Sequence, residues 1–134
     1  MLQSTPSNHA MQGTDLCGDA YAAWPVLDAH TRIAEFGGDA EGYDEVAEMV
    51  LFEGDAMRRS LRAAPGADHA AVAAVLHEVA NNCAMVGAQR CALLTRAVEI
   101  KLRQALPIDV APAIQAIETE LNLMLRELAC RKGT

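Results

Sequence analysis

Large apolar residues recur at helical spacing along much of the chain, most clearly over residues 70–86. This stretch contains no proline or glycine. On a helix with about 100° per residue, its larger apolar side chains all lie within roughly 60° of Val79. These residues are Val72, Val75, Leu76, Val79, Cys83 and Val86. The pattern predicts one helix with a single stripe facing a core.

His77 stands on the other side of this predicted helix. It lies about 160° from Val79, so its imidazole is expected to point away from the core. The other residues expected on this outward face have short side chains. They are Ala70, Ala73, Ala74, Asn81 and Ala84, with Ala80 beside them. An outward face usually carries long charged side chains. Because this face has short ones instead, the ring is expected to be open to a large partner. A surface histidine without any role is the alternative interpretation.

Two helices are predicted before this stretch. The first is short and ends at Gly37-Gly38, because glycine often follows a helix C-terminus. Asp39 or Asp44 can cap the second. The apolar residues of the second recur at spacings of three and four: Ala47, Val50, Gly54, Met57 and Leu61, with Val46, Met49 and Phe52 widening the stripe. A glycine inside a helix costs up to ~1 kcal/mol relative to alanine, so Gly54 indicates a close helix approach.

Two more helices are predicted after it. Asp68 can cap the His77 helix, and Gly87 can end it because glycine adopts positive φ. A helix over about 88–105 has Cys91, Leu94, Val98 and Leu102 inward and a solvated face with Arg90, Arg96, Lys101 and Arg103. The last helix follows Asp109, with Ile114, Ile117, Leu121, Met124 and Leu128 on one stripe. The predicted fold is therefore all-α, an antiparallel four-helix bundle with an additional short N-terminal helix.

Composition agrees with one domain of closely packed helices. The 134 residues are 51% hydrophobic but only 4% aromatic, and alanine, leucine and valine dominate. Such small and aliphatic residues favour helices. The polar, aperiodic N-terminus predicts a flexible tail over 1–23, followed by the helical domain over 24–131 and a frayed C-terminus over 132–134.

Charge and cysteine content narrow the classes of partner. A formal charge of -7 argues against nucleic acid as a partner. No apolar run approaches the ~20 residues that span a bilayer, and the first residues lack a secretory signal, so the cytoplasm is the expected location. Cys83 and Cys91 fall on predicted core stripes. The four cysteines show no ligand spacing, so a structural zinc site is not expected.

The segment over residues 77–99 resembles the signature of histidine-containing phosphotransfer (HPt) domains. In that family an apolar residue and a Lys-Gly pair follow the phosphorylated histidine, and a glycine ends the helix ten residues on. The matching positions here are Val79, Val86, Gly87, Ala88, Cys91, Leu94, Val98 and Glu99. His77 aligns with the phospho-acceptor. The resemblance extends loosely over residues 24–126.

The resemblance implies that His77 carries a phosphoryl group between receiver domains of a hybrid histidine kinase and of a response regulator. The chain would be a carrier more than a stand-alone catalyst. It would need no cofactor of its own, with Mg²⁺ bound only by the partner receiver. The residues expected near the site are Ala73, Ala74, Ala80, Asn81, Ala84 and Glu99. Glu99 could accept a hydrogen bond from the ring, or it could be an ordinary surface glutamate. The chain is expected to act as a monomer.

The sequence departs from the family beside the histidine, where Ala80-Asn81 replaces Lys-Gly. Without the lysine, the site lacks a cation that could pair with a phosphoryl group. Asn81 could crowd the site or donate to phosphoryl oxygens. Compensating cations could come from Arg58, Arg59 or Arg62.

Two alternatives follow from this departure. A degenerate HPt domain could bind a receiver, a kinase or another enzyme without carrying phosphate. A bundle that binds metal or haem through His77 is the weaker alternative, because no second ligand falls beside it.

Overall fold

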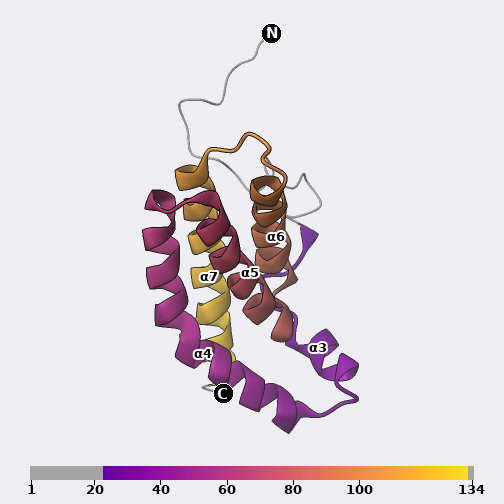
Figure 1. The fold of residues 1–134 in the computed structure, drawn as a ribbon. Coiled ribbons are helices and arrows are strands. Elements are labelled where there is room, and N and C mark those ends of the chain that lie inside the picture. The colour runs from indigo at the N-terminus through magenta and orange to yellow at the C-terminus, as the bar shows by residue number, and fades with distance from the viewer. Residues whose placement is uncertain (1–22, 133–134) are drawn as a thin grey trace.

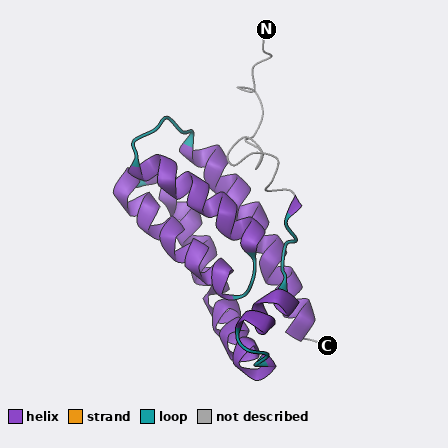
Figure 2. Cartoon of the chain, turned by 90° about the vertical axis from the view of Figure 1, so that its right-hand side faces the viewer, coloured by secondary structure: helices purple, strands orange, loops and turns teal. Residues whose placement is uncertain are grey.

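The computed structural model describes residues 23–132, and within this range the chain is helical without any strand (Figures 1 and 2). The elements are α3 (Ala29–Glu35), α4 (Ala40–Ala63), a 3₁₀ turn (Ala64–Gly66), α5 (His69–Met85), α6 (Gln89–Arg103) and α7 (Val110–Lys132). The all-α class is therefore confirmed. Residues 1–22 of the tail predicted over 1–23, and the last two residues of the chain, lie outside the described residues. Helix α7 continues one residue past the predicted domain end at residue 131.

The long helices α4, α5, α6 and α7 lie side by side, and each runs opposite in direction to the one before it (Figure 1). The short α3 lies across the end where α4 begins and α5 ends. Each long helix contributes fully buried side chains to one core, and the largest of these are Tyr43, Leu61, Leu76, Leu94, Ile117, Leu121, Met124 and Leu128. Burial of this continuous apolar core is the main driving force that holds the helices together.

The structure corrects the predicted stripe of α4 in part. Asp39 caps the helix by accepting from the backbone N–H of Gly42. The inward positions predicted from the spacing are buried, and Gly54 lies so close to α7 that an added Cβ would be 3.1 Å from Leu125 Cδ1. The predicted widening by Met49 and Phe52 is wrong, because these side chains are 62% and 84% exposed. They lie about 140° and 160° around the helix from Gly54, which is too far to reach the core.

Contacts from α3 and α4 fix the C-terminal end of α5. Gly87, at φ +85°, ends the helix, and the Ala88 N–H donates to the Cys83 carbonyl. The carbonyls of Met85, Val86 and Gly87 receive donors from outside the helix. Arg32 Nε donates to Met85 O, Tyr43 Oη to Val86 O, and the Asp28 N–H to Gly87 O. Carbonyls at a helix end that would otherwise lack partners are thus satisfied, and the helix that carries His77 is held in place.

Replacing Tyr43 with phenylalanine should lower the free energy of unfolding by about 1 to 2 kcal/mol, because the Val86 carbonyl then loses its buried donor. The Tyr43 hydroxyl lies 2.6 Å from Val86 O, and burial raises the pKa of Tyr43, so the phenol stays a neutral donor. Urea denaturation measures the change. The control Thr119→Ala removes an exposed hydroxyl that bonds to Gln115 O and should change stability by less than about 0.5 kcal/mol. Equal effects of the two substitutions would contradict the assigned role.

Candidate functional site

His77 lies in the middle of α5 with 57% of its side chain exposed. Four residues with short side chains surround it on the outward face. Ala70, Ala74 and Asn81 are exposed, and Ala84 is half-buried. The ring is therefore accessible above small neighbours, as expected from the sequence.

Ala73 and Ala80 do not belong to this exposed face, and their predicted placement beside His77 on the outward surface is wrong. Both are 1% exposed and lie in the buried interface of α5. The prediction centred the core stripe on the larger apolar residues around Val79. In the structure α5 packs most extensively against α6, and small alanine side chains let the two helices approach closely. The buried arc is thus wider on the α6 side, and His77 lies at its edge.

Glu99 of α6 contacts the imidazole. Its side chain is only 10% exposed, and Oε2 lies 3.1 Å from His77 Nδ1. The two residues meet because α5 and α6 are antiparallel around the turn at Gly87, which lies at similar distances along the chain from both. Of the two interpretations of Glu99, the structure supports the contact with the ring and excludes an ordinary surface glutamate.

Arg103 completes the cluster, and the sequence interpretation missed it. Its Nε lies 2.8 Å from the same Glu99 Oε2 that contacts His77, and its side chain is half exposed. The sequence placed Arg103 on a solvated face with the other basic residues of this helix. The available signal was the spacing of four residues between Glu99 and Arg103, which brings opposite charges together on a helix.

The geometry selects one nitrogen of His77 for chemistry. A carboxylate that also accepts from an arginine has only acceptor capacity to offer the ring. Nδ1 therefore donates to Glu99, and a neutral ring then has its lone pair on Nε2. Such a contact fixes both the tautomer and the orientation of an imidazole. The arrangement presents Nε2 as an accessible nucleophile.

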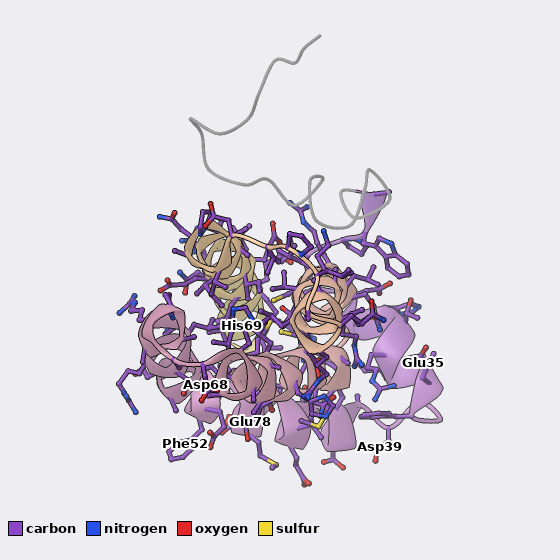
Figure 3. The ribbon with its side chains drawn as sticks, turned by 45° about the horizontal axis from the view of Figure 1, so that its top comes forward. Glu35, Asp39, Phe52, Asp68, His69 and Glu78 are labelled. Atoms are coloured by element: carbon purple, nitrogen blue, oxygen red, sulfur yellow. The ribbon has the colours of Figure 1, made fainter. Side chains whose placement is uncertain are left out.

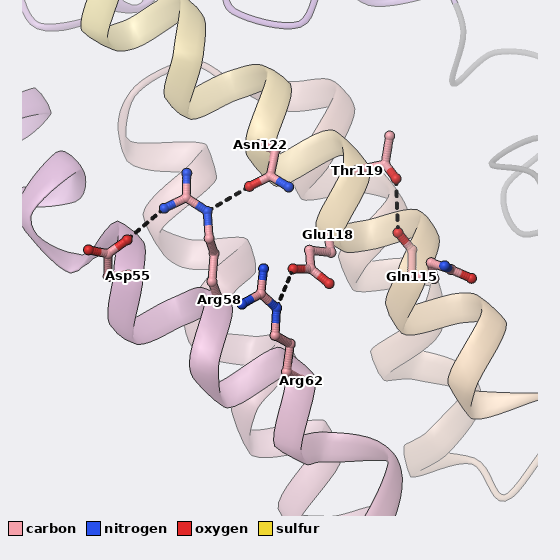
Figure 4. A network of polar contacts seen from close by, with 7 residues as sticks. All are labelled: Asp55, Arg58, Arg62, Gln115, Glu118, Thr119 and Asn122. Carbon is pink, nitrogen blue, oxygen red and sulfur yellow. Dashed lines mark hydrogen bonds and ion pairs between the residues drawn. The ribbon is translucent and has the colours of Figure 1, made fainter.

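Arg58 and Arg62 do not supply the cation that Ala80 lacks. Arg58 Nε lies 2.6 Å from Asn122 Oδ1, and Arg62 Nε lies 2.8 Å from Glu118 Oε2 (Figure 4). Both partners belong to α7 and not to α5, the helix that carries His77. Arg59 lies about 140° around the helix from Gly54 and is exposed. The possibility that α4 supplies a compensating cation, which the sequence left open, therefore gains no support from these contacts.

Comparisons with known proteins identify no relative. No family model, curated protein or solved structure matches the chain. The assignment of the site therefore depends on its residues and their geometry.

The remaining reactive side chains are placed differently from His77. His30 and His69 are exposed near the starts of α3 and α5. Cys83 and Cys91 are buried, as predicted, and a hydrogen bond with Cys91 together with burial holds the pKa of Cys83 well above its usual value.

Within residues 23–132, no three His, Cys, Asp or Glu side chains are grouped so that they could hold a metal ion. None of the described helices combines the length and apolarity that a membrane span requires.

Proposed function

We propose that this protein is a phosphocarrier that accepts a phosphoryl group on His77 and exchanges it with aspartates of receiver domains in a two-component phosphorelay. The observation that carries the proposal is the cluster of His77, Glu99 and Arg103, in which a buried carboxylate orients an exposed ring. The resemblance to HPt domains over residues 77–99 supports the same function. We further infer an HPt-like four-helix bundle, with α3 as its additional N-terminal helix, that acts as a cytoplasmic monomer.

In the proposed reaction, Nε2 of neutral His77 attacks the phosphorus of an aspartyl phosphate on the partner. The N–P bond forms as the bond to the aspartate oxygen breaks, and the aspartate leaves as a carboxylate. The ring becomes cationic, and Glu99 stabilises it through the Nδ1 proton. Phosphoryl transfer depends mainly on in-line positioning and charge stabilisation. In the reverse step an aspartate of a second receiver attacks the phosphorus and regenerates neutral His77.

Arg103 can provide the positive charge that Lys supplies in HPt domains. It shares an oxygen of Glu99 with His77, and its half-exposed guanidinium has further donors. A guanidinium forms strong charge-assisted bonds to phosphoryl oxygens. In this proposal Mg²⁺ and its acidic ligands belong to the receiver.

Incubation with phosphorylated receiver domains from the same organism tests the proposal. The expected product is a phosphoprotein whose label survives alkali and is lost in acid, as a phosphoramidate should be. Mass spectrometry should place the label on His77 and not on His9, His30 or His69. Failure of every receiver to transfer phosphate would overturn the carrier function.

A second candidate, a silent HPt-like module that binds its partner without phosphate, has one observation in its favour. Ala80 is buried where HPt domains have lysine, and Arg58 and Arg62 are paired with α7. This candidate predicts receiver binding in a pull-down or by calorimetry with no transfer. The same incubation therefore separates the two functions.

Glu99→Ala should slow transfer to His77 by roughly tenfold to a hundredfold, because the ring loses its orienting partner. Glu99→Gln should retain part of the transfer rate, because its amide oxygen still accepts a hydrogen bond from Nδ1 although it carries no charge. The ¹⁵N NMR shifts of His77 give a second readout, because loss of the contact should mix the two tautomers. Glu127→Ala, an exposed glutamate on α7, is the matched control. Unchanged tautomer and rate in Glu99→Ala would show that Glu99 does not position the ring.

A further inference from the structure

A groove between α4 and α5 is distinct from the His77 cluster. Its volume is about 380 Å³, and its lining residues are Glu48, Met49, Phe52, Glu53, Asn82 and Met85. Asn82 and Met85 lie on the edge of α5 that faces α4, whereas His77 lies on the edge that faces α6. A role for the groove therefore does not depend on the proposed function of His77.

The rim of this groove exposes unusually large apolar side chains. Phe52 is 84% exposed and Met49 is 62% exposed, the two highest values among the large apolar residues of the described chain. Figure 3 shows Phe52 projecting from α4 into solvent, on the same side of the view as Glu78 of α5. Exposed apolar side chains gathered around a hollow are typical of surfaces that bind another protein.

The charged residues that line the groove, Glu48 and Glu53, are both acidic. Residues 40–57 of α4 contain six acidic residues and no Lys or Arg: Glu41, Asp44, Glu45, Glu48, Glu53 and Asp55. The whole of α5 adds only Glu78. Some of these carboxylates are already paired, as Asp44 is with Arg131 and Asp55 with Arg58. The uniform sign nevertheless favours a basic partner, because complementary potentials guide association and exclude wrong partners.

Charge disfavours three other occupants. A second copy joined by two-fold symmetry would place two acidic rims against each other. Residues 1–22 of this chain contain two aspartates and no Lys or Arg, so this segment lacks the complementary charge. An anionic membrane surface attracts Lys and Arg, which the rim does not have.

We propose that the groove between α4 and α5 is a docking site for a basic amphipathic helix of a partner protein. The apolar face of that helix covers Met49, Phe52 and Met85. Its flanking Lys or Arg side chains face the acidic rim. An amphipathic helix in a groove is a common mode of peptide recognition, read through apolar residues at helical spacing.

A designed peptide tests this proposal with the full chain. The probe is a fluorescent helical 18-mer with leucines on one face and Lys and Arg beside them, and its partner probe has Glu at every basic position. Fluorescence anisotropy should show saturable binding of the basic probe alone, and added salt should weaken it. In ¹³C NMR spectra the methyl signals of Met49 and Met85 should shift, while that of buried Met124 should not.

Three variants make the test specific to the groove. Phe52→Ala should lower the affinity for the basic probe about tenfold or more, as loss of an aromatic anchor does. The variant should fold, because the Phe52 side chain is exposed. Glu53→Lys should lower the affinity for the basic probe and raise the affinity for the acidic probe. Ile100→Ala, at an exposed apolar residue of α6, is the control and should leave binding unchanged.

Several outcomes would overturn the proposal. Equal binding of the two probes, or basic binding that persists in Phe52→Ala, would mean that the groove does not select a basic helix. A dimer in sedimentation velocity that dissociates in Phe52→Ala would assign the groove to a second copy. Binding to phosphatidylserine vesicles that requires Phe52 would assign it to a membrane.

Discussion

Replacing His77 with glutamine is expected to reduce phosphoryl acceptance from receivers by at least about a thousandfold, because an amide nitrogen is not a nucleophile toward phosphorus. The substitution should barely affect stability. The imidazole is 57% exposed, and exposed substitutions usually change the free energy of unfolding by less than about 0.5 kcal/mol. Receiver binding should persist, since Ala74, Asn81 and Ala84 remain in place. The measurement is the initial rate of label transfer from a phosphorylated receiver.

His69→Gln is the matched control for this prediction. His69 lies in the first turn of the same helix and is exposed, but it is about two turns along α5 from His77. It should accept and release phosphate at the rate of the unaltered protein. Full labelling of His77→Gln would show that the phosphate resides elsewhere and would end the carrier proposal.

The contact between His77 and Glu99 could be anticipated because it depends on connectivity. A helix that ends at a glycine and returns immediately must pair residues at similar distances from the turn. Gly87 lies between His77 and Glu99 in this way, so their approach follows from the sequence order. The caps at Asp39 and Asp68 could be predicted for a similar reason, since each depends only on a few neighbouring residues.

The rotation of each helix about its own axis was harder to predict. Ala73 and Ala80 are buried because α6 covers that side of α5, and the hydrophobic pattern of α5 alone contains no information about α6. Met49 and Phe52 are the opposite case, because they are apolar residues on a side of α4 that none of the described helices covers. The apolar type of these residues was interpreted as a sign of burial. The angular position of a residue around its helix decides whether its side chain is buried.

Pairing between charged residues was also missed, both within α6 and between α6 and α7. Arg90 was expected in solvent, yet its Nε lies 3.0 Å from Glu120 Oε1, and the Glu120 side chain is only 7% exposed. Arg103 was assigned to the same solvated face and instead contacts Glu99. Both partners are glutamates on the edge of a buried arc. Long basic side chains reach such carboxylates while their ends stay near solvent. The spacing of four residues indicates the pair within α6, but no spacing indicates the pair between α6 and α7.

Replacing Gly87 with alanine is expected to lower the free energy of unfolding by about 3 kcal/mol, for two reasons that add. Gly87 has φ +85°, a conformation that costs an L side chain about 1 to 2 kcal/mol. An added Cβ would also lie 2.6 Å from the Asp28 carbonyl oxygen. Relief of that clash must displace the start of α3 and disturb the hydrogen bond between the Asp28 N–H and Gly87 O.

Two other glycines separate the conformational cost from the clash. Gly37 has φ +75° with open space around it, so Gly37→Ala should cost only the conformational part, about 1 to 2 kcal/mol. Gly66 has neither a positive φ nor a neighbour within 4 Å, so Gly66→Ala should be neutral or slightly stabilising. Urea denaturation of the three variants measures the differences. Because the Gly87 turn sets the alignment of α5 and α6, Gly87→Ala should also disturb the ¹⁵N shifts of His77. Equal destabilisation in Gly87→Ala and Gly37→Ala would mean that the approach of α3 does not constrain this turn.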